Sequence, residues 1–290
     1  MEIEADARHG SRRMIPLATP NLTGKESEYV AQAIVSNWVG PAGPFVERFE
    51  EKVAKAAGRR WAVATITGTA ALHAAAYVTM MSNGLREVEI PRSAFPAARN
   101  VLLALDYPVV MRGNGVNHDE QHYLNICDRA PAIGEPSTKA DLECYSFAAN
   151  KIVTCGHGGA IVGDWWGTED RVRSIIHQGY GRSGMFNYRM ANLNAALGCA
   201  QMERLDELKK AKRRIWKRYE SAGLPMIERG ASRWMATVDM PRGLVEYLKA
   251  NDIESRAESS GGVSIPCSTG LTEADQDKVI EACMSWMSWR

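Results

Sequence analysis

The chain has 290 residues, of which 45% are hydrophobic and 24% are charged, an ordinary balance for a globular protein. This composition argues against a disordered or collagen-like chain, and the length suffices for one large domain or two smaller ones. Its 35 basic and 34 acidic residues leave a net charge of +1, so no general electrostatic attraction to nucleic acid or to an anionic membrane is expected.

The six cysteines include no Cys-x-x-Cys pair and lie in apolar stretches. This spacing argues against a zinc ribbon or a redox dithiol, and it favours small buried thiols in a reducing compartment. Residues 1–13 have no apolar core, so no signal peptide is expected, and apolar windows such as 70–81 are too short to cross a bilayer. We therefore predict a cytoplasmic protein with neither a membrane nor a nucleic acid as partner.

Hydrophobic periodicity and turn signals predict helices that alternate with strands along the first half of the chain. In chain order we expect helices at 26–36 and 45–57, a strand at 61–65, a helix at 70–81, a strand at 87–90, a helix at 97–105, and short strands at 123–127, 144–147, 152–153 and 160–162. This alternation indicates an α/β sheet flanked by helices.

The second half is predicted to be mainly helical. A long helix is expected at 190–221, followed by helices at 242–251 and 273–286. We place the boundary between a large and a small part inside the long helix, near Lys210. The predicted organisation is a flexible leader (1–14), a large domain (15–210) and a small C-terminal domain (211–290).

Thr67-Gly68-Thr69 lies between a predicted strand and a predicted helix. The unpaired N–H groups of a helix N-terminus can bind phosphate, glycine lets the phosphate approach, and threonine adds a hydroxyl. A plain helix cap at Thr69 explains the same residues. Taken alone, the motif favours the cap.

Lys151 stands among small and apolar residues before a glycine-rich turn, and Asp128 ends a predicted apolar strand. Burial lowers the pKa of a lysine and makes it a better nucleophile towards a carbonyl, although a lone lysine is more often exposed on a loop. Open α/β sheets place ligand-binding groups at strand ends, so Asp128 could pair with a cationic ring nitrogen. It could equally cap the next segment, and the sequence leaves both open.

Three further patterns are interpreted without a functional site. His118 and His122 are four residues apart, as metal ligands on a helix can be, but flanking glycines and asparagines predict a solvated loop and no metal site. The basic run at 209–214 follows acidic residues on a predicted helix, which favours a solvated helix face over a nucleic-acid site. The tryptophans are interpreted as packing or interface residues.

Several long motifs occur in one order from Ile15 to Glu207. They are IPLATPNLTGKESEYV, NWVGPAGPFVERFE, AVATITGTAALHAA, PRSAFPAARN, SFAANKIVTCGHGGAIVGD and FNYRMANLNAALGCAQMERLDE, with a weaker match, SIPCSTGLTEAD, at 264–275. With these motifs the chain resembles the DegT/StrS family of sugar aminotransferases that depend on pyridoxal 5'-phosphate (PLP). NKIVT and NYRMANLNAALGCAQ are similar to the branch that aminates UDP-linked 4-keto-6-deoxy sugars for legionaminic-acid-type or bacillosamine-type pathways.

The resemblance implies the type I PLP-dependent aminotransferase fold: a central mixed, mostly parallel sheet flanked by helices, plus a small, reduced C-terminal α/β domain. It implies that Lys151 binds PLP covalently and later moves a proton between the substrate carbon and the cofactor carbon. Asp128 would bond the pyridine nitrogen and keep it protonated, so that the ring acts as an electron sink. Phe95 would stack on the ring.

The remaining implied cofactor residues concern the phosphate. Thr67, Gly68, Thr69 and Ser146 would hold it from within one chain. Asn187 would reach the phosphate in the neighbouring subunit. The resemblance therefore implies an obligate homodimer with shared active sites.

The implied reaction has two halves. An amino acid, expected to be L-glutamate, gives its amino group to the cofactor and leaves as 2-oxoglutarate. The aminated cofactor then converts a nucleotide-linked 4-keto-6-deoxy sugar into a 4-amino sugar. A sugar dehydratase of the same fold is an alternative, but dehydrating members carry His where this chain has Lys151. A non-catalytic PLP-binding remnant of the family is another.

The sequence departs from the family pattern at three places. Pro131 stands where the family usually has Gln, Glu or His, so a side-chain hydrogen bond to the ring hydroxyl is lost or replaced. His157 stands where Glu or Gly is usual. Only 17 residues separate Val110 from Asp128, where the family normally fits a further strand and helix. The central sheet could therefore lack strands and cover the substrate less, and the part after residue 210 is also compressed.

Overall fold

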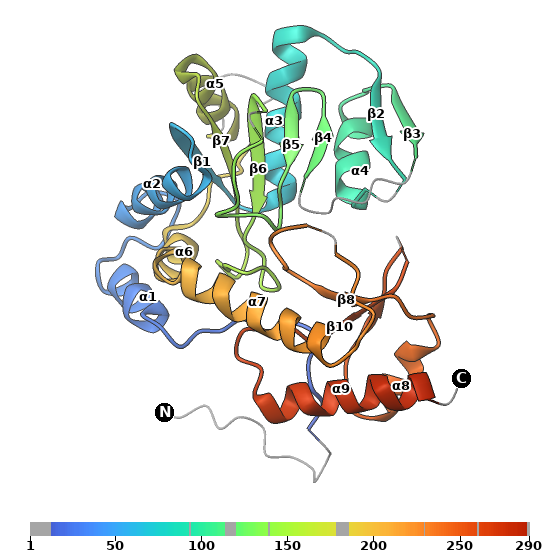
Figure 1. Ribbon diagram of the computed structural model, residues 1–290. Coiled ribbons are helices and arrows are strands. Elements are labelled where there is room, and N and C mark those ends of the chain that lie inside the picture. Colours follow the sequence, from blue (N-terminus) through green and yellow to red (C-terminus); the bar gives the residue numbers. More distant parts are fainter. Residues whose placement is uncertain are drawn as a thin grey trace.

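The computed structural model describes residues 13–92, 94–113, 120–138, 140–177, 186–228, 230–259 and 261–288. A five-stranded mixed sheet in the order β1-β7-β6-β5-β4 occupies the centre of the larger part (Figure 1). Its strands are β1 (Trp61–Thr65), β7 (Gly159–Gly163), β6 (Leu142–Ser146), β5 (Ile126–Asp128) and β4 (Gln121–Tyr123). β5 and β6 run parallel, and the other neighbouring pairs are antiparallel.

The carboxyl ends of β1, β5 and β6 meet at one edge of this sheet. This follows because β1 and β6 are both antiparallel to β7, while β5 is parallel to β6. Thr65 and Ser146 both pair with Gly159, and Asp128 pairs with Cys144. Open α/β sheets bind ligands at this kind of edge. The topology therefore brings two candidate residues, Asp128 and Ser146, to one end of the sheet.

Helices cover both faces of the five-stranded sheet. Successive side chains of a strand point to opposite faces, so each strand contributes to two hydrophobic cores. Ala62 and Ala64 of β1 belong to one hydrophobic core, and Trp61 and Val63 belong to the other. The first core includes α1 (Glu26–Val35), α2 (Pro44–Ala57) and α6 (Asn192–Glu203), and the second includes α3 (Gly68–Asn83) and α5 (Trp166–Ile176). The result is a three-layer α/β arrangement.

A separate sheet of two parallel strands lies beside this unit. It consists of β2 (Val88–Pro91) and β3 (Val109–Arg112), joined through α4 (Pro96–Ala104). Between β3 and β5, the described chain contains only the three-residue strand β4. Within the described ranges no ladder joins the two sheets. The short spacing between residues 110 and 128 thus corresponds to a central sheet that is interrupted on this side.

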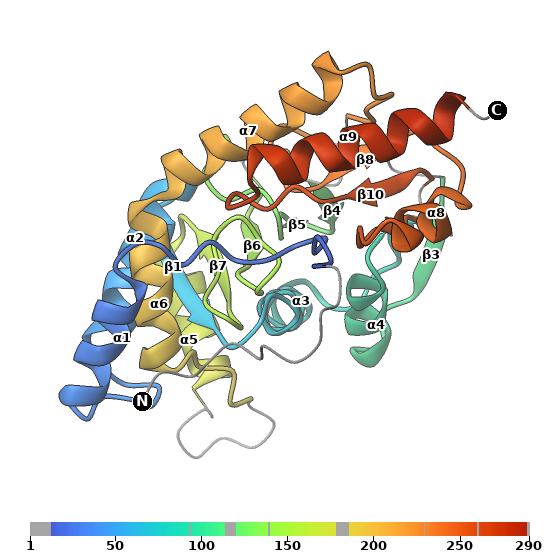
Figure 2. The same ribbon diagram turned by 90° about the horizontal axis from the view of Figure 1, so that it is seen from below.

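The smaller part of the molecule contains a three-stranded antiparallel sheet (Figure 2). Its strands are β8 (Ala236–Val238), β10 (Val263–Ile265) and β9 (Arg256–Ala257), and its helices are α7 (Leu205–Ser221), α8 (Leu244–Ala250) and α9 (Glu273–Ser288). Leu208 of α7 packs with the larger part, whereas Ile215 and Tyr219 pack with the smaller one. Helix α7 therefore spans both parts, and a domain boundary between residues 210 and 211 stays a prediction.

Residues near the N-terminus complete the smaller part. The Ile15 N–H donates to the Asp252 carbonyl at 2.8 Å, and the Glu254 N–H donates to the Ile15 carbonyl at 2.9 Å. Ile15 itself is 2% exposed in the core of this part. The flexible leader expected at 1–14 lies almost wholly outside the described residues.

Two expected strands differ from the structure. The strand expected at 123–127 is wrong, because a turn at Leu124, with a left-handed φ of 59°, folds β4 back onto β5. The strand expected at 152–153 is also wrong, because Ile152 and Val153 lie in a loop with side chains 5% and 0% exposed. An apolar run fits a tight hairpin or a buried loop as well as it fits one strand.

The long helix expected at 190–221 is wrong in one respect: it is two helices, α6 and α7, separated at Arg204. The guanidinium of Arg204 pairs with Glu207 at 2.7 Å and with Glu26 at 3.5 Å. Hydrophobic spacing continues across the break, which is why the pattern predicts one helix. The local patterns also did not predict β3, α5 or the positions of the strands in the smaller part, although the resemblance implied an α/β domain there. No helix in the described ranges is long and apolar enough to cross a bilayer.

Candidate active site

The turn between β1 and α3 places Thr67-Gly68-Thr69 at the edge where β1, β5 and β6 end. Thr67 is the N-cap, and its Oγ1 accepts a hydrogen bond from the Ala70 N–H at 3.0 Å. The expected cap at Thr69 is wrong, because the extended backbone of Thr67 directs its hydroxyl towards the N–H three residues later. The side chain of Thr69 is exposed in the first turn. The first N–H groups of a helix have no partner within it, so this end of α3 can bind an anion.

Two glycines let β6 and β7 approach this turn closely. A Cβ atom on Gly68 would lie 2.6 Å from the Ser146 Cβ, closer than Cβ atoms pack. A Cβ atom on Gly159 would collide with the carbonyl group of Thr67. Ser146, the last residue of β6, therefore lies against the start of α3, and the structure brings Thr67, Gly68 and Ser146 together.

Asp128 ends β5 at the same edge, with a partly buried side chain. Its Oδ1 accepts a hydrogen bond from the Ala130 N–H at 3.0 Å, so the capping function is confirmed. Burial raises the pKa of Asp128, while the Ala130 N–H and the positive charge of Lys151 act in the opposite direction. A carboxylate in this environment is stabilised by a cationic neighbour, and Lys151 is one.

Lys151 lies in the loop that connects β6 to β7. The Phe147 N–H donates to the Gly158 carbonyl at 2.8 Å and closes this loop at its base. The side chain of Lys151 is partly buried, and its Nζ lies over the ring of Trp234, 3.6 Å from the ring centroid. The interpretation of Lys151 as an exposed loop lysine is therefore wrong. The lysine faces an aromatic ring from the smaller part and influences the carboxyl group of Asp128.

Trp234 is a site residue that the sequence did not reveal. It belongs to the segment between α7 and β8, and its Nε1–H donates to the Asn150 carbonyl at 2.6 Å. The Trp234 carbonyl accepts a hydrogen bond from Nζ of the buried Lys212 at 2.9 Å. The smaller part thus reaches the loop that carries Lys151. No local pattern marks Trp234, because its partner lies 84 residues away in the chain.

Phe95 and Asn187 come from two other elements. Phe95 is the N-cap of α4, and its side chain is 69% exposed. Asn187 lies in a segment that pairs with the end of β1, where the Ile66 N–H donates to the Tyr188 carbonyl at 2.7 Å. Asn187 therefore lies near the start of α3 in its own chain. Stacking by Phe95 and a phosphate contact from Asn187 to a second subunit stay predictions.

The histidines and Pro131 contribute less to this edge. His118 lies outside the described residues. His122 is in β4 and not in a loop as expected, with its Nε2 3.7 Å from the Cys127 Sγ. In the part of the chain that the structure describes, no group of three or more His, Cys, Asp or Glu side chains is placed to hold a metal ion. His157 is exposed in the glycine turn, and Pro131 is buried.

Arg129, the residue that follows Asp128 in the chain, belongs to a buried network of charged side chains. Arg129 is fully buried, and its Nη1 donates to the Pro136 carbonyl at 2.7 Å and to Glu143 at 3.3 Å. Glu143 is also fully buried; it accepts a hydrogen bond from the Tyr145 hydroxyl at 2.7 Å and pairs with Arg59 at 3.3 Å. The long side chain of Arg129 thus places a charge in the core.

Comparison with known proteins gives a consistent set of relatives. The model of the DegT/DnrJ/EryC1/StrS aminotransferase family matches residues 20–140 and 120–228. The chain is 30% identical to the GDP-perosamine synthase of Vibrio cholerae over 309 aligned positions, which cover 84% of each protein. It is 29% identical to the GDP-perosamine synthase of Caulobacter vibrioides, covering 92% of this chain and 97% of that one.

Solved structures show the same fold. PseC of Helicobacter pylori, described as an aminotransferase involved in the biosynthesis of pseudoaminic acid, superposes with a TM-score of 0.84 at 15% identity, covering 96% of this chain and 100% of that one. DesI, solved with its TDP-sugar product, gives a TM-score of 0.79 at 20% identity, covering 94% and 92%. The predicted α/β fold class is confirmed.

Proposed function

Because the chain belongs to the DegT/DnrJ/EryC1/StrS aminotransferase family, we propose that it transfers an amino group from L-glutamate to a nucleotide-linked 4-keto-6-deoxy sugar, giving a 4-amino sugar. Its general activity is that of a PLP-dependent sugar aminotransferase. The GDP in the names of two relatives and the TDP-sugar product of DesI support a nucleotide-linked acceptor. The position of the keto group at C4 of the sugar and the identity of the donor as L-glutamate rest on the resemblance of the sequence motifs.

The geometry of the sheet edge supports PLP as the cofactor. The N-terminus of α3 meets the Ser146 side chain where Gly68 leaves no room for a Cβ, which fits a phosphate held by Thr67, Gly68, Thr69 and Ser146. A protonated pyridine nitrogen beside Asp128 would supply the cationic partner that its partly buried carboxyl group favours. These residues therefore fit the group.

The observation that carries the proposal is that Asp128, Ser146 and the start of α3 meet at one edge of the sheet, with Lys151 in the loop that directly follows β6. PLP, when bound, supplies an electron sink for charge that develops on the substrate carbon. Lys151 would bind the cofactor between turnovers and, once its amine is released, move the proton between the substrate carbon and the cofactor carbon. The exposed ring of Phe95 would stack on the pyridine.

The main test is a visible absorbance spectrum of the protein with PLP, before and after addition of L-glutamate. The wild-type protein should show the band of the lysine-bound cofactor and lose it with L-glutamate, whereas Lys151→Ala should show neither. Transamination at the wild-type rate in Lys151→Ala would exclude this mechanism. The interrupted sheet is the one observation in favour of a non-catalytic PLP-binding function. A visible band that stays unchanged after addition of an amino acid would support that alternative.

We also propose that the enzyme is a homodimer in which Asn187 completes the neighbouring site. Large apolar side chains are exposed close to the Asn187 segment: Trp38 is 52% exposed, Val39 45% and Ile66 47%. The Trp38 carbonyl accepts a hydrogen bond from Asn192, and the Ile66 N–H donates to the Tyr188 carbonyl, so Trp38 and Ile66 lie next to the 187–192 segment. Exposed apolar patches of this kind mark protein interfaces.

Mixing two inactive variants tests the shared site. Lys151→Ala and Asn187→Ala homodimers should each have low activity. A mixed dimer should contain one intact site, with Lys151 from one protomer and Asn187 from its partner. Co-expression should therefore restore activity, and light scattering should give twice the chain mass. Absence of any recovery in mixed dimers would show that Asn187 acts within its own chain.

The cysteines bear on the compartment. All six are free and buried. Unpaired thiols are typical of reducing compartments, and nucleotide-linked substrates fit the same setting. We infer a cytoplasmic location, which fractionation of the native host would test.

A further inference from the structure

Trp234 comes from the smaller part of the molecule but contacts the loop that carries Lys151. The centroid of its ring lies 3.6 Å from Nζ of Lys151, and its Nε1–H donates to the Asn150 carbonyl at 2.6 Å. The Lys151 N–H in turn donates to the Ala148 carbonyl at 3.0 Å, which closes a tight turn at this point of the loop. One indole therefore contacts both the side-chain nitrogen of Lys151 and the backbone just before it.

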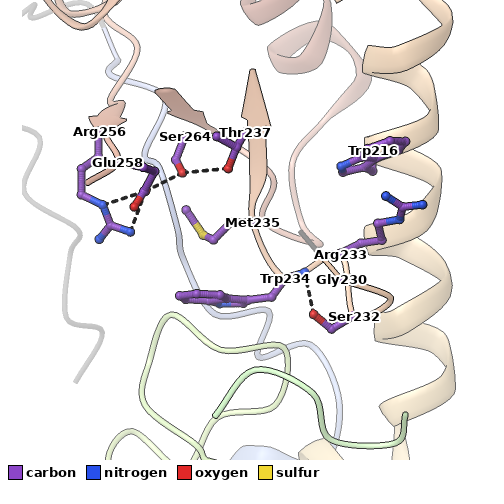
Figure 3. A pocket seen from close by; sticks show the side chains of 10 residues that line it. All are labelled: Trp216, Gly230, Ser232, Arg233, Trp234, Met235, Thr237, Arg256, Glu258 and Ser264. Atoms are coloured by element: carbon purple, nitrogen blue, oxygen red, sulfur yellow. Dashed lines mark hydrogen bonds and ion pairs between the residues drawn. The ribbon is translucent and has the colours of Figure 1, made fainter. Parts of the chain in front are cut away.

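The backbone of Trp234 is held by hydrogen bonds within the smaller part. Its N–H donates to the Ser232 hydroxyl at 3.3 Å, as the dashed line beside Trp234 in Figure 3 shows. Its carbonyl accepts hydrogen bonds from Nζ of Lys212 at 2.9 Å and from the Cys267 thiol at 3.4 Å. Lys212 and Cys267 are both buried. The indole thus projects towards Lys151 from a fixed support.

The residue before Trp234 has a strained backbone. The φ of Arg233 is 52°, in the left-handed region that residues with a Cβ seldom adopt. Such conformations cost free energy and persist only where surrounding contacts impose them. The guanidinium of Arg233 supplies two contacts: it stacks on Trp216, 3.8 Å from the ring centroid, and pairs with Glu228 at 2.7 Å. The smaller part therefore imposes the turn that directs Trp234 towards the loop.

The contact between Lys151 and Trp234 favours one chemical form of the lysine. An ammonium group is attracted to the electron-rich face of an aromatic ring, and among the aromatic side chains tryptophan attracts it most. The attraction is stronger where the pair is shielded from water, and both side chains are partly buried here. A neutral amine lacks the charge on which this attraction depends. The indole therefore stabilises Lys151 as an ammonium group.

Covalent binding of PLP requires Lys151 to give up this form. The ammonium group must leave the ring face and lose a proton to solvent. Its nitrogen can then attack the aldehyde carbon of PLP, which forms a carbon–nitrogen bond and releases one water molecule. The bonded nitrogen has exchanged hydrogens for a carbon and no longer carries the compact charge of an ammonium group, so it gains less from the indole. Trp234 therefore stabilises the free lysine relative to the bonded one.

We propose that Trp234 is a positioning residue that holds the amine of Lys151 while the lysine is not bonded to the cofactor. The proposal rests on the proposed function, in which Lys151 binds PLP between turnovers and is released during each one. The contact should oppose covalent binding of PLP and favour release of the lysine. Trp234 also packs against the core of the larger part, and a purely structural role predicts the opposite effect on PLP binding.

NMR of the cofactor-free protein tests the contact directly. The protein is labelled with ¹³C at the Cε atoms of its lysines, and the Lys151 signal is assigned by its disappearance in Lys151→Ala. The ring current of Trp234 should shift the Lys151 Cε protons upfield of those of the other lysines. In Trp234→Leu the signal should return to the position of the others. A wild-type Lys151 signal that already lies among the other lysines would overturn the proposal.

Calorimetric titration with PLP measures the consequence in a double-mutant cycle. The effect of Trp234→Leu on PLP affinity is measured in the wild-type protein and in Lys151→Ala, where no bond to PLP can form. The ratio of the two effects should favour tighter binding with Lys151 present by about 2- to 30-fold, the range for a cation–π contact. Trp234→Phe keeps a weaker ring, so its ratio should be smaller. A ratio of one or less for Trp234→Leu would overturn the proposal.

Trp286→Leu is the matched control, because it removes the same ring elsewhere in the smaller part. Trp286 of α9 is partly buried and packs on Tyr247, with 5.3 Å between the ring centroids. Its Lys151 signal and PLP affinity should equal those of the wild-type protein, and circular dichroism establishes that each variant is folded. A wild-type protein with the PLP affinity and visible spectrum of Lys151→Ala would refute the proposed function, whereas the NMR experiment contains no PLP and still tests the contact.

Discussion

The two sides of the five-stranded sheet are built in different ways. On the β1 side, five-residue strands pair along their whole length, and Gly68 and Gly159 bring chain segments into contact. On the β4 side, β4 and β5 are each three residues long. Arg129, which directly follows β5, forms a buried ion pair with Glu143 of β6. The candidate site uses the β1 side and the end of β5. The shortening therefore lies beside the site, and a site made of strand ends and one helix start can persist there.

This difference predicts that stability and cofactor binding can be separated by mutation. Substitutions in the buried pair of Arg129 and Glu143 should lower the free energy of unfolding and leave the affinity of the folded protein for PLP nearly unchanged. Changes at the start of α3 should lower the affinity for PLP and cost less stability than the loss of the buried charge pair. The variants below test this separation.

Glu143→Gln should have the largest effect. It removes the buried counter-charge of Arg129 and leaves only the more distant Glu120, at 3.7 Å, and breaking a buried pair costs about 3–5 kcal/mol. Urea unfolding measures the loss, and PLP titration below the transition should give an affinity close to that of the wild-type protein. The double variant Arg129→Met with Glu143→Met removes both charges and should recover most of the stability. A double variant as unstable as Glu143→Gln would show that the unpaired charge of Arg129 is not the cause of the loss.

Gly68→Ala should mainly affect PLP. The new Cβ would lie 2.6 Å from the Ser146 Cβ, so the turn must open and the phosphate site must widen. We expect PLP affinity to fall more than about tenfold and stability to fall by about 1–3 kcal/mol. Gly167→Ala is the control, because a Cβ there meets nothing within 4 Å. Wild-type PLP affinity in Gly68→Ala would show that this close approach is not needed.

Thr67→Ala should have a smaller effect on the stability of the cofactor-free protein. It removes the side-chain acceptor for the Ala70 N–H and should cost about 0.5–2 kcal/mol. Thr69→Ala, within the first turn, should change cofactor-free stability by less than about 0.5 kcal/mol. Thermal unfolding of both variants without PLP decides which threonine caps α3. A larger loss in Thr69→Ala would reverse the assignment.

The smallest effect is expected from pH. Burial alone would raise the pKa of Glu143, but hydrogen bonds from Ser137, Tyr145 and Thr138 and the charge of Arg129 bring it below its ordinary value of 4.5. A lowered carboxyl pKa stabilises the fold above about pH 4.5, and this contribution is lost as the pH falls through the folded-state value. The wild-type free energy of unfolding should therefore fall more steeply below pH 4.5 than that of Glu143→Gln. Parallel curves would contradict this.

Much of the larger part could be predicted because its signals are local. Helical periodicity is sufficient for α2 and α3, and the ordered motifs led to Lys151 and Asp128. The rest depends on contacts between distant segments. Trp234 reaches Asn150 from the other part of the molecule, and nothing near it in the sequence indicates this. Arg129 has the charge of a surface residue, yet it is buried because Glu143 and a carbonyl group compensate it.

The hydrogen bonds between Ile15 and residues 252–254 have a consequence for synthesis. Ile15 leaves the ribosome among the first of the described residues, but its partners are made about 240 residues later. At roughly 5–20 residues per second, translation separates the two by about 12–50 s. The larger part can begin to fold during this interval. The smaller part must wait, with Ile15 exposed, until the chain is almost finished, so a premature stop before residue 252 would leave it incomplete.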